Sequence, residues 1–257
     1  MERLAVHLIP VLRDNYIFLL VDTQEPKAVV IDPAQAQPVI KQVESLGVEL
    51  IAILNTHHCW DHVGGNQALK ARYPQLKIYA SQVDGERKRV PGQTEQLKHG
   101  DTFSFAGEEI QVFFVPGHTL GHIAYWLPQS GHLFAGDTLF GAGCGRLHEG
   151  TPAQMQASLN QLRSLPDETL VWCAHEYTLN NLRFALTVDP NNPDLKERLQ
   201  TTEVLRTQGK PTVPLCLAEE KRTNPFLRYD QPALQKSTGE FDPVSVFAKV
   251  RSLKDRW

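Results

Sequence analysis

The most telling segment of the sequence is Leu50-Ile51-Ala52-Ile53-Leu54-Asn55-Thr56-His57-His58-Cys59-Trp60-Asp61-His62. Its apolar first half is typical of a buried strand, and its second half gathers three imidazoles, a thiol and a carboxylate on one short turn. Gly64-Gly65-Asn66 comes next, and a helical pattern then begins. The imidazoles, the thiol and the carboxylate are all side chains that bind metals, and a packed core does not need them together. Because the end of a strand holds a short loop rigidly, the segment predicts one half of a metal site.

Three later strand-like segments each deliver one further metal-ligand side chain. His118 follows the apolar run 110–115, Asp137 ends the run 132–136, and His175 follows the run 169–174. A single histidine after a strand is weak evidence, because it is more often a capped or solvated residue. Four strands that present such side chains at one edge are the arrangement that a shared metal site requires.

The pattern resembles the metallo-β-lactamase superfamily, whose signature is Thr-His-x-His-x-Asp-His followed by a later His, Asp and His. Several segments look like one member family, glyoxalase II, the hydroxyacylglutathione hydrolases. These segments are Asp61-His62-Val63-Gly64-Gly65-Asn66, Gly143-Cys144-Gly145-Arg146, His148-Glu149-Gly150-Thr151, His175-Glu176-Tyr177-Thr178 and Asn224-Pro225-Phe226-Leu227-Arg228. With Arg251 and Lys254 near the end, the resemblance covers essentially the whole chain.

Strand and helix patterns alternate up to about residue 171 and then give way to helices, which favours two sheets with helices outside them. The resemblance implies the specific form, an αββα sandwich of the metallo-β-lactamase type with a small helical C-terminal domain. We therefore expect a catalytic domain over residues 1–173 and a substrate-binding domain over residues 174–257. Residues 210–228 are rich in proline and predict an irregular stretch, and Asp242-Pro243 predicts the start of a last helix with Val244, Phe247 and Val250 inward.

Carried over residue by residue, the resemblance implies two divalent metal ions. His57, Cys59 and His118 would hold the first; Asp61, His62 and His175 would hold the second; and Asp137 would bridge both. Zinc is the expected metal, and iron or manganese also suits a mixed histidine and carboxylate site. A hydroxide that bridges the metals would be the nucleophile, and Asp61 would have the further catalytic role of orienting it.

Cys59 departs from the family pattern, which has a histidine there. Two interpretations remain open. The thiolate ligates the first metal, which adds negative charge and lowers the Lewis acidity of the ion. Alternatively, its short side chain leaves that site weak or empty.

Substrate recognition is a separate inference. Arg251 and Lys254 lie three residues apart and so share a helical face, which suits them to clamp a carboxylate. The family grips the glycine end of glutathione with an arginine and a lysine at these places, and Tyr177 matches a tyrosine that contacts glutathione. Arg146 and His148 stand where the family often has lysine and an aromatic residue. His7, His99, His132 and Asp32 are expected to be structural, and His122 either supports the site or packs beside it.

The resemblance therefore implies a thioester hydrolase that converts S-D-lactoylglutathione and water to D-lactate and glutathione, the second step of methylglyoxal detoxification. One alternative is a persulfide dioxygenase with a single iron held by His57, His118 and Asp137. Another is a glutathione-conjugate binding protein whose metal site is impaired at Cys59.

Composition restricts the partners. The chain is 41% apolar and 21% charged, with a formal net charge of −3, so it has no basic surface suited to nucleic acid. No apolar run approaches about 18 residues, so neither a membrane span nor a secretory signal is expected. Cysteines 59, 144, 173 and 216 lack the spacing of a disulfide framework, which favours a cytoplasmic protein. A monomer is expected.

Overall fold

The computed structural model describes residues 3–257. Residues 1–2 lie outside the described residues, and they belong to the segment for which no secretory signal is expected. Contacts divide the chain into two compact units: the described part of Met1–Phe114 with Gly121–Gly136, and Val115–Leu120 with Asp137–Trp257. The predicted boundary near residue 173 stays a prediction, because the second unit also includes segments that precede it.

The first unit contains a mixed sheet with the strand order β1-β2-β3-β4-β5-β6. The strands are β1 (Leu4–Val11), β2 (Asn15–Asp22), β3 (Lys27–Ile31), β4 (Glu49–Leu54), β5 (Lys77–Ser81) and β6 (Glu95–Leu97). β1 to β3 pair antiparallel, whereas β3 to β6 run parallel. Every residue of β2 is buried, because this strand lies inside the sheet with both faces covered.

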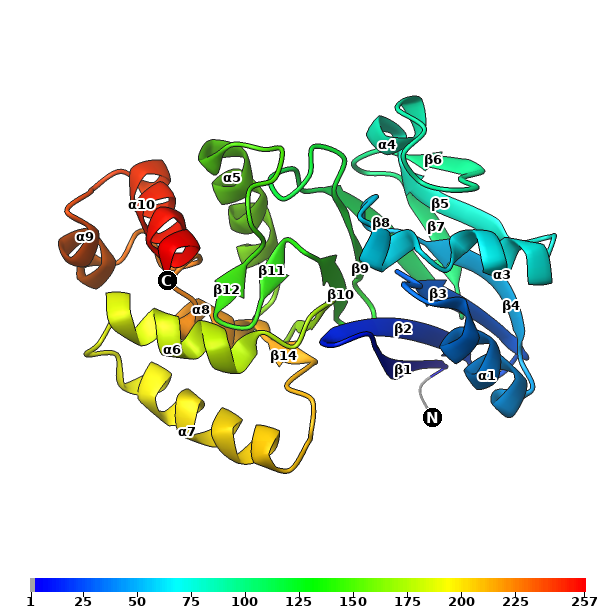
Figure 1. Ribbon diagram of the computed structural model, residues 1–257, viewed down its shortest axis with the longest axis horizontal. Helices are drawn as coiled ribbons and strands as arrows, with labels where there is room; N and C mark the ends of the chain where they lie inside the picture. Colours follow the sequence, from blue (N-terminus) through cyan, green and yellow to red (C-terminus); the bar gives the residue numbers. More distant parts are fainter. Residues whose placement is uncertain (1–2) are drawn as a thin grey trace. The chain divides into compact units, whose positions relative to one another are not determined.

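Helices cover one face of this sheet. They include α1 (Ala36–Leu46) and α3 (Asn66–Arg72), while α2 (Trp60–Val63) and α4 (Gln82–Glu86) are single turns after β4 and β5. Val39 and Val43 of α1 are buried one turn apart, and they join Leu69 of α3 in the apolar cluster of the sheet. Figure 1 shows α1 and α3 on the same side of the strands.

The same unit holds an antiparallel meander of four strands. These are β7 (Thr102–Phe105), β8 (Glu108–Phe114), β9 (Ile123–Leu127) and β10 (His132–Gly136), each paired with the next. Aromatic rings connect it to the first sheet: Phe18 of β2 lies 5.6 Å from Phe134 of β10, and Tyr79 of β5 stacks on Phe103 of β7 at 5.2 Å. The two sheets therefore pack face to face, as the sequence predicts for the sandwich.

The second unit is largely helical. It contains α5 (Pro152–Arg163), α6 (Thr178–Val188), α7 (Pro193–Thr207), α8 (Leu217–Thr223), α9 (Pro232–Thr238) and α10 (Pro243–Arg256), with the short strands β11 (Leu139–Phe140), β12 (Gly143–Cys144), β13 (Leu170–Cys173) and β14 (Leu215–Cys216). α6 packs against α7, and α10 against α5 and α9 (Figure 1). Thr151 and Gln154 form a reciprocal cap at the start of α5, and Asp242 caps α10.

Two predictions for this unit were wrong in detail. The stretch 210–228 is not irregular throughout, because α8 lies within it. The buried face of α10 includes Val246 beside Phe247 and Val250, whereas Val244 is half-buried. Among the described residues, none of the helices is both long enough and apolar enough to span a bilayer.

Candidate metal centre

In the first unit, the predicted metal donors lie on the loop that follows β4. This strand has parallel neighbours on both sides, and the carboxyl edge of parallel strands is where α/β proteins place reactive groups. His57, Cys59, Asp61 and His62 all leave this edge on the loop or in α2. His57 and His62 are buried, and their rings lie 4.0 Å apart. The structure therefore brings the two imidazoles together.

Asp32 anchors this loop. It follows β3, is buried, and has a left-handed backbone with φ of 48°. Its Oδ1 accepts a hydrogen bond from the Thr56 amide at 2.8 Å, and its Oδ2 accepts one from Thr56 Oγ1 at 2.6 Å. His62 Nδ1 lies 3.0 Å from the same Oδ2. Although Asp32, His57 and His62 form a compact cluster of donor atoms, the oxygens of Asp32 are occupied by these bonds. Asp32 orients the histidines.

These contacts determine which nitrogen each histidine offers. A carboxylate can only accept, so His62 Nδ1 carries a proton and, in the neutral ring, Nε2 keeps the lone pair. Thr56 uses its single hydroxyl proton on Asp32, so its oxygen accepts from His57 Nδ1 at 3.0 Å. His57 likewise keeps its lone pair on Nε2. Both rings are prepared to bind a cation through Nε2.

Asp61 is supported by Asn15, a buried residue at the start of β2. Asn15 Nδ2 donates to the backbone oxygen of Asp61 at 3.1 Å and lies 3.4 Å from its Oδ2. Asp61 Oδ1 lies 3.9 Å from His62 Nε2. The carboxylate is therefore held with one oxygen toward Asn15 and the other toward the imidazole.

Two other histidines of the first unit border the donor loop. The buried ring of His122 stacks on His57, with centroids 4.6 Å apart and planes 20° apart. His58 Nδ1 lies 3.3 Å from Asp84 Oδ1, and Arg89 pairs with the same buried carboxylate at 2.8 Å. His122 thus supports a predicted ligand, and His58 faces Asp84.

In the second unit, the predicted ligands meet around one carboxylate. Asp137 Oδ2 lies 3.5 Å from His118 Nε2, and Asp137 Oδ1 lies 3.4 Å from His175 Nε2. All three side chains are buried, with Asp137 7% exposed. Each oxygen of the carboxylate faces a different imidazole.

These distances suit metal coordination. Nitrogen and oxygen ligands about 2.0–2.1 Å from a tetrahedral zinc lie about 3.4 Å from each other. His118 Nδ1 donates to the backbone oxygen of Arg146 at 2.9 Å, so in the neutral ring Nε2 keeps the lone pair. A lone pair that faces a carboxylate oxygen is repulsive unless a cation lies between them. The donor set therefore fits a divalent metal.

Two predicted substrate residues lie against these ligands. The ring of His148 meets that of His118 edge to face at 4.8 Å, and the backbone N–H of His148 donates to His118 O at 3.1 Å. Tyr177 stacks on His175, with centroids 4.8 Å and planes 6° apart. Tyr177 and His148 therefore border the predicted metal ligands of this unit.

The cationic residues of the second unit form a separate group. Arg251 is buried and donates to the backbone oxygen of Cys144 at 3.0 Å, and it pairs with Asp255 at 2.8 Å. Lys254 Nζ is buried over the rings of Phe184 and Trp257, and no described group accepts a hydrogen bond from it. Burial, followed by the charges of Arg251 and Arg146, lowers the pKa of Lys254 to about 8. This group carries positive charge without full compensation, which suits an anion.

Asp32 and Asn15 support the candidate site but were not predicted to do so from the sequence. Asp32 ends the apolar run of β3 as Asp137 ends that of β10, so the same signal was present. Asn15 gave no such signal, because its contact with Asp61 joins residues 46 positions apart.

Comparisons with known proteins agree with this geometry. Residues 12–175 match the family model described as metallo-beta-lactamase superfamily, and residues 176–257 match that described as hydroxyacylglutathione hydrolase C-terminus. Among curated relatives, a hydroxyacylglutathione hydrolase of Synechococcus sp. (strain JA-2-3B'a(2-13)) is 61% identical over 97% of this chain and 98% of its own length. A hydroxyacylglutathione hydrolase of Synechocystis sp. (strain ATCC 27184 / PCC 6803 / Kazusa) is 56% identical over 98% of this chain and 99% of its own.

Solved structures share the fold. ETHE1 from Myxococcus xanthus is 28% identical with a TM-score of 0.65, over 86% of this chain and 83% of that one. TTHA1623 in a di-iron-bound form is 28% identical with a TM-score of 0.57, over 66% of this chain and 91% of that one. The expected sandwich with a helical C-terminal region is confirmed. Divalent metal binding by this chain is confirmed as well. The chain belongs to the hydroxyacylglutathione hydrolase family of the metallo-β-lactamase superfamily.

Proposed function

We propose that the protein hydrolyses S-D-lactoylglutathione to D-lactate and glutathione at two divalent metal ions, with zinc as the expected metal and iron or manganese as alternatives. The main support for the metal centre is the arrangement of the Asp137 carboxylate. One of its oxygens faces Nε2 of His118, and the other faces Nε2 of His175. A carboxylate held in this way is suited to bridge two cations. The family membership supports the substrate class.

His57, Cys59 and His118 would hold one metal, Asp61, His62 and His175 the other, and Asp137 both. The tautomers of His57 and His62, fixed by Asp32 and Thr56, support this assignment. The di-iron form of TTHA1623 supports a pair of ions. When bound, such ions lower the pKa of water toward neutrality and polarise a carbonyl oxygen.

The residues of the chain supply orientation and charge. Asn15 holds Asp61 so that its second oxygen is available to accept a proton from water and to orient it toward the thioester carbon. A thiolate leaves without protonation, so the reaction requires no separate general acid. Arg251 and Lys254 would bind the carboxylate of the glutathione glycine, and Tyr177, Arg146 and His148 would contact the rest of the glutathione.

Substituting Lys254 by methionine should raise KM by about tenfold at pH 7 with little change in kcat, because one charge-assisted hydrogen bond to substrate is lost. In the wild type, Lys254 is charged below its pKa of about 8 and neutral above it. The KM of the wild type should therefore rise as the pH passes through about 8, and that of the variant should not. Steady-state kinetics from pH 6.5 to 9.5 measure both effects.

Lys249→Met provides the matched control, because Lys249 is an exposed lysine on the same helix. It should leave KM and its pH dependence unchanged. Equal KM values for the Lys254 variant and the wild type would remove Lys254 from the binding site.

Cys59 is expected to ligate through its thiolate. The Cys59→His variant should then shift the acidic limb of the kcat profile to lower pH, since a neutral ligand leaves the metal a stronger Lewis acid. In cobalt-substituted protein, the wild type should show a sulfur-to-cobalt charge-transfer band in the near ultraviolet that the variant lacks. An absent band in the wild type, with equal metal content in both proteins, would make Cys59 a bystander.

The function itself is tested by loss of thioester absorbance from S-D-lactoylglutathione, measured beside a count of metals per chain. Turnover that chelation abolishes and zinc restores is the expected result. Oxygen uptake with glutathione persulfide and no thioester hydrolysis would instead support the dioxygenase. Binding of the thioester without turnover would support the impaired binding protein.

We further propose a cytoplasmic monomer. The four cysteines, all within the described residues, form no disulfide with one another, which suits a reducing compartment. Light scattering of the purified protein at micromolar concentration tests the oligomeric state, and a mass of two chains would contradict it.

A further inference from the structure

The hairpin of β11 and β12 joins three parts of the second unit. Asp137 lies just before it, and the Cys144 oxygen at its end accepts from Arg251. The next residues contact a predicted ligand, because the Arg146 oxygen accepts from His118 Nδ1. The fit is tight, because a Cβ on Gly145 would clash with the backbone oxygen of Asp137. The position of this hairpin therefore sets that of the bridging carboxylate and of Arg251.

Buried side chains from the C-terminal helices hold the turn of the hairpin. Asn224 Nδ2 donates to the oxygens of Phe140 and Gly143 at 3.1 and 3.0 Å, and Asn181 Nδ2 donates to that of Gly141 at 3.0 Å. Glu220 Oε2 accepts from the Ala142 amide at 2.9 Å. Ala142 has a φ of 50°, a left-handed conformation that a non-glycine residue adopts only when its surroundings impose it.

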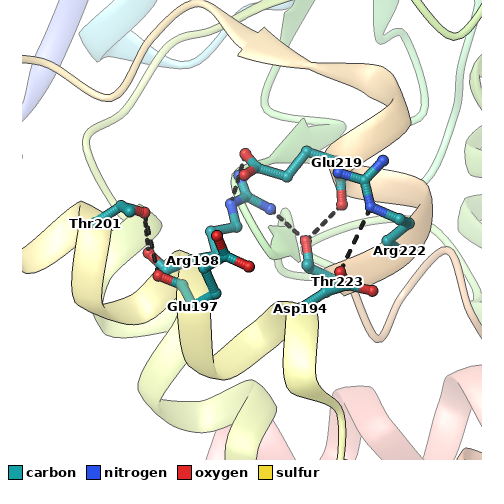
Figure 2. A pocket seen from close by; sticks show the side chains of 7 residues that line it. All are labelled: Asp194, Glu197, Arg198, Thr201, Glu219, Arg222 and Thr223. Atoms are coloured by element: carbon teal, nitrogen blue, oxygen red, sulfur yellow. Dashed lines mark hydrogen bonds and ion pairs between the residues drawn. The ribbon is translucent and has the colours of Figure 1, made fainter.

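Glu220 is completely buried, so its charge requires a partner. Its Oε1 accepts from Arg198 Nη2, and Arg198 is itself only 4% exposed. Burial lowers the pKa of Arg198, whereas the negative charge of Glu220 raises it. The net effect is a raised pKa. Figure 2 shows Arg198 reaching from α7 toward Glu219 and Thr223 of α8.

A cavity of about 150 Å³ is lined by Arg198 and other residues of α7 and α8, as Figure 2 shows. Its charges already pair with each other, Arg198 with Glu219 at 3.0 Å and Arg222 with Asp194 at 3.8 Å. The pair is connected to the hairpin through Glu220 and Asn224. Asn224 Nδ2 lies 2.9 Å from Glu220 Oε2.

We propose that the Arg198–Glu220 ion pair is a positioning device for the metal centre: it fixes the turn at Ala142, and through the hairpin it places the Asp137 carboxylate and the Arg251 guanidinium. This inference rests on the proposed function and deepens it. It makes α7 and α8, which carry none of the predicted ligands, determinants of metal retention and of turnover.

The Glu220→Gln variant tests the device. Its amide oxygen can still accept from Ala142, but its NH₂ then faces the buried Arg198, donor against donor. We expect faster hydrogen exchange of the 139–144 amides, fewer metals per chain after dialysis against chelator, and kcat lower by about 10- to 100-fold, the usual effect of losing a group that orients a ligand. KM should rise less than kcat falls, because the Lys254 ammonium lies over the rings of Phe184 and Trp257 and not against Glu220 or Arg198.

Asp189→Asn is the matched control. It removes another buried carboxylate of the same unit, which pairs with Arg228 at 3.0 Å and not with the hairpin. It should lower Tm comparably without changing metal retention or kcat. If Glu220→Gln lowers Tm alone, as the control does, the pair is merely structural and the proposal fails.

A second comparison covers the case in which Glu220→Gln does not fold. Arg198→Met leaves a buried carboxylate unpaired, whereas Arg198→Met/Glu220→Gln leaves no buried charge and keeps an acceptor for Ala142. The double variant should therefore retain more metal and turn over faster than Arg198→Met. No recovery in a folded double variant would refute the proposal. Hydrogen exchange and metal retention do not require the thioester, so they decide the inference even if the proposed substrate is wrong.

Discussion

Substituting Asp137 by asparagine should lower kcat by a factor on the order of 1,000 or more and should remove metal from the purified protein. Each oxygen of Asp137 faces a different imidazole, 3.5 Å from His118 and 3.4 Å from His175. An amide has one oxygen for two such positions, and its NH₂ would point at the other. It also lacks the charge that offsets repulsion between two cations.

The expected KM of the Asp137 variant is close to that of the wild type, because Arg251 and Lys254 are untouched. Metal analysis, circular dichroism and steady-state kinetics on the same preparation separate metal loss from misfolding. The Asp189→Asn protein, which loses a buried carboxylate elsewhere in the unit, should keep its metals. A variant at position 137 that holds two metals and turns over normally would contradict the bridging role.

The candidate ligands could be picked out from the sequence because the signal for each of them is local. An apolar strand followed within three residues by histidine or aspartate places that side chain at a sheet edge, whatever the rest of the fold does. β4 followed by His57, and β10 followed by Asp137, both follow this pattern. The start of α10 at Asp242-Pro243 was predictable for the same reason, since a cap is a local feature.

The supporting residues depend on pairings that one sequence does not encode. Asp32 meets Thr56 because β3 and β4 are parallel with Ile31 opposite Leu54, and this register exists only in the folded sheet. Glu220 reaches Ala142 across 78 positions from a helix that the proline-rich composition had obscured. Candidate ligands can be recognised from their side-chain chemistry. The groups that orient them can be recognised only when their neighbours in the folded structure are known.

Asp32 is therefore the second position at which a large effect is expected. The Asp32→Asn variant should bind metal 10- to 100-fold more weakly, with a comparable loss of kcat/KM, as is usual when the partner of a ligating histidine is removed. The carboxylate accepts from three donors: the Thr56 amide, the Thr56 hydroxyl and His62 Nδ1. In either orientation the asparagine NH₂ faces at least one of these donors. Asparagine tolerates the left-handed backbone at φ 48°, so the substitution adds little strain.

The variant should also change which nitrogen of the histidines is protonated. If the NH₂ of asparagine donates to His62 Nδ1, the proton moves to Nε2 and the ring can no longer bind a cation there. Titration of the metal-free protein with zinc, followed by competition with a chelator, measures the loss directly. Asp22→Asn is the control in the same unit: that carboxylate is buried and its pKa is lowered to about 2, mainly by the Arg3 hydrogen bond, but it contacts no predicted ligand. Equal zinc affinity for the wild type and Asp32→Asn would mean that the imidazoles are oriented without the carboxylate. Of the two variants, only the Asp22→Asn control should keep the zinc affinity of the wild type, because weakening the fold does not by itself alter the tautomer of His62.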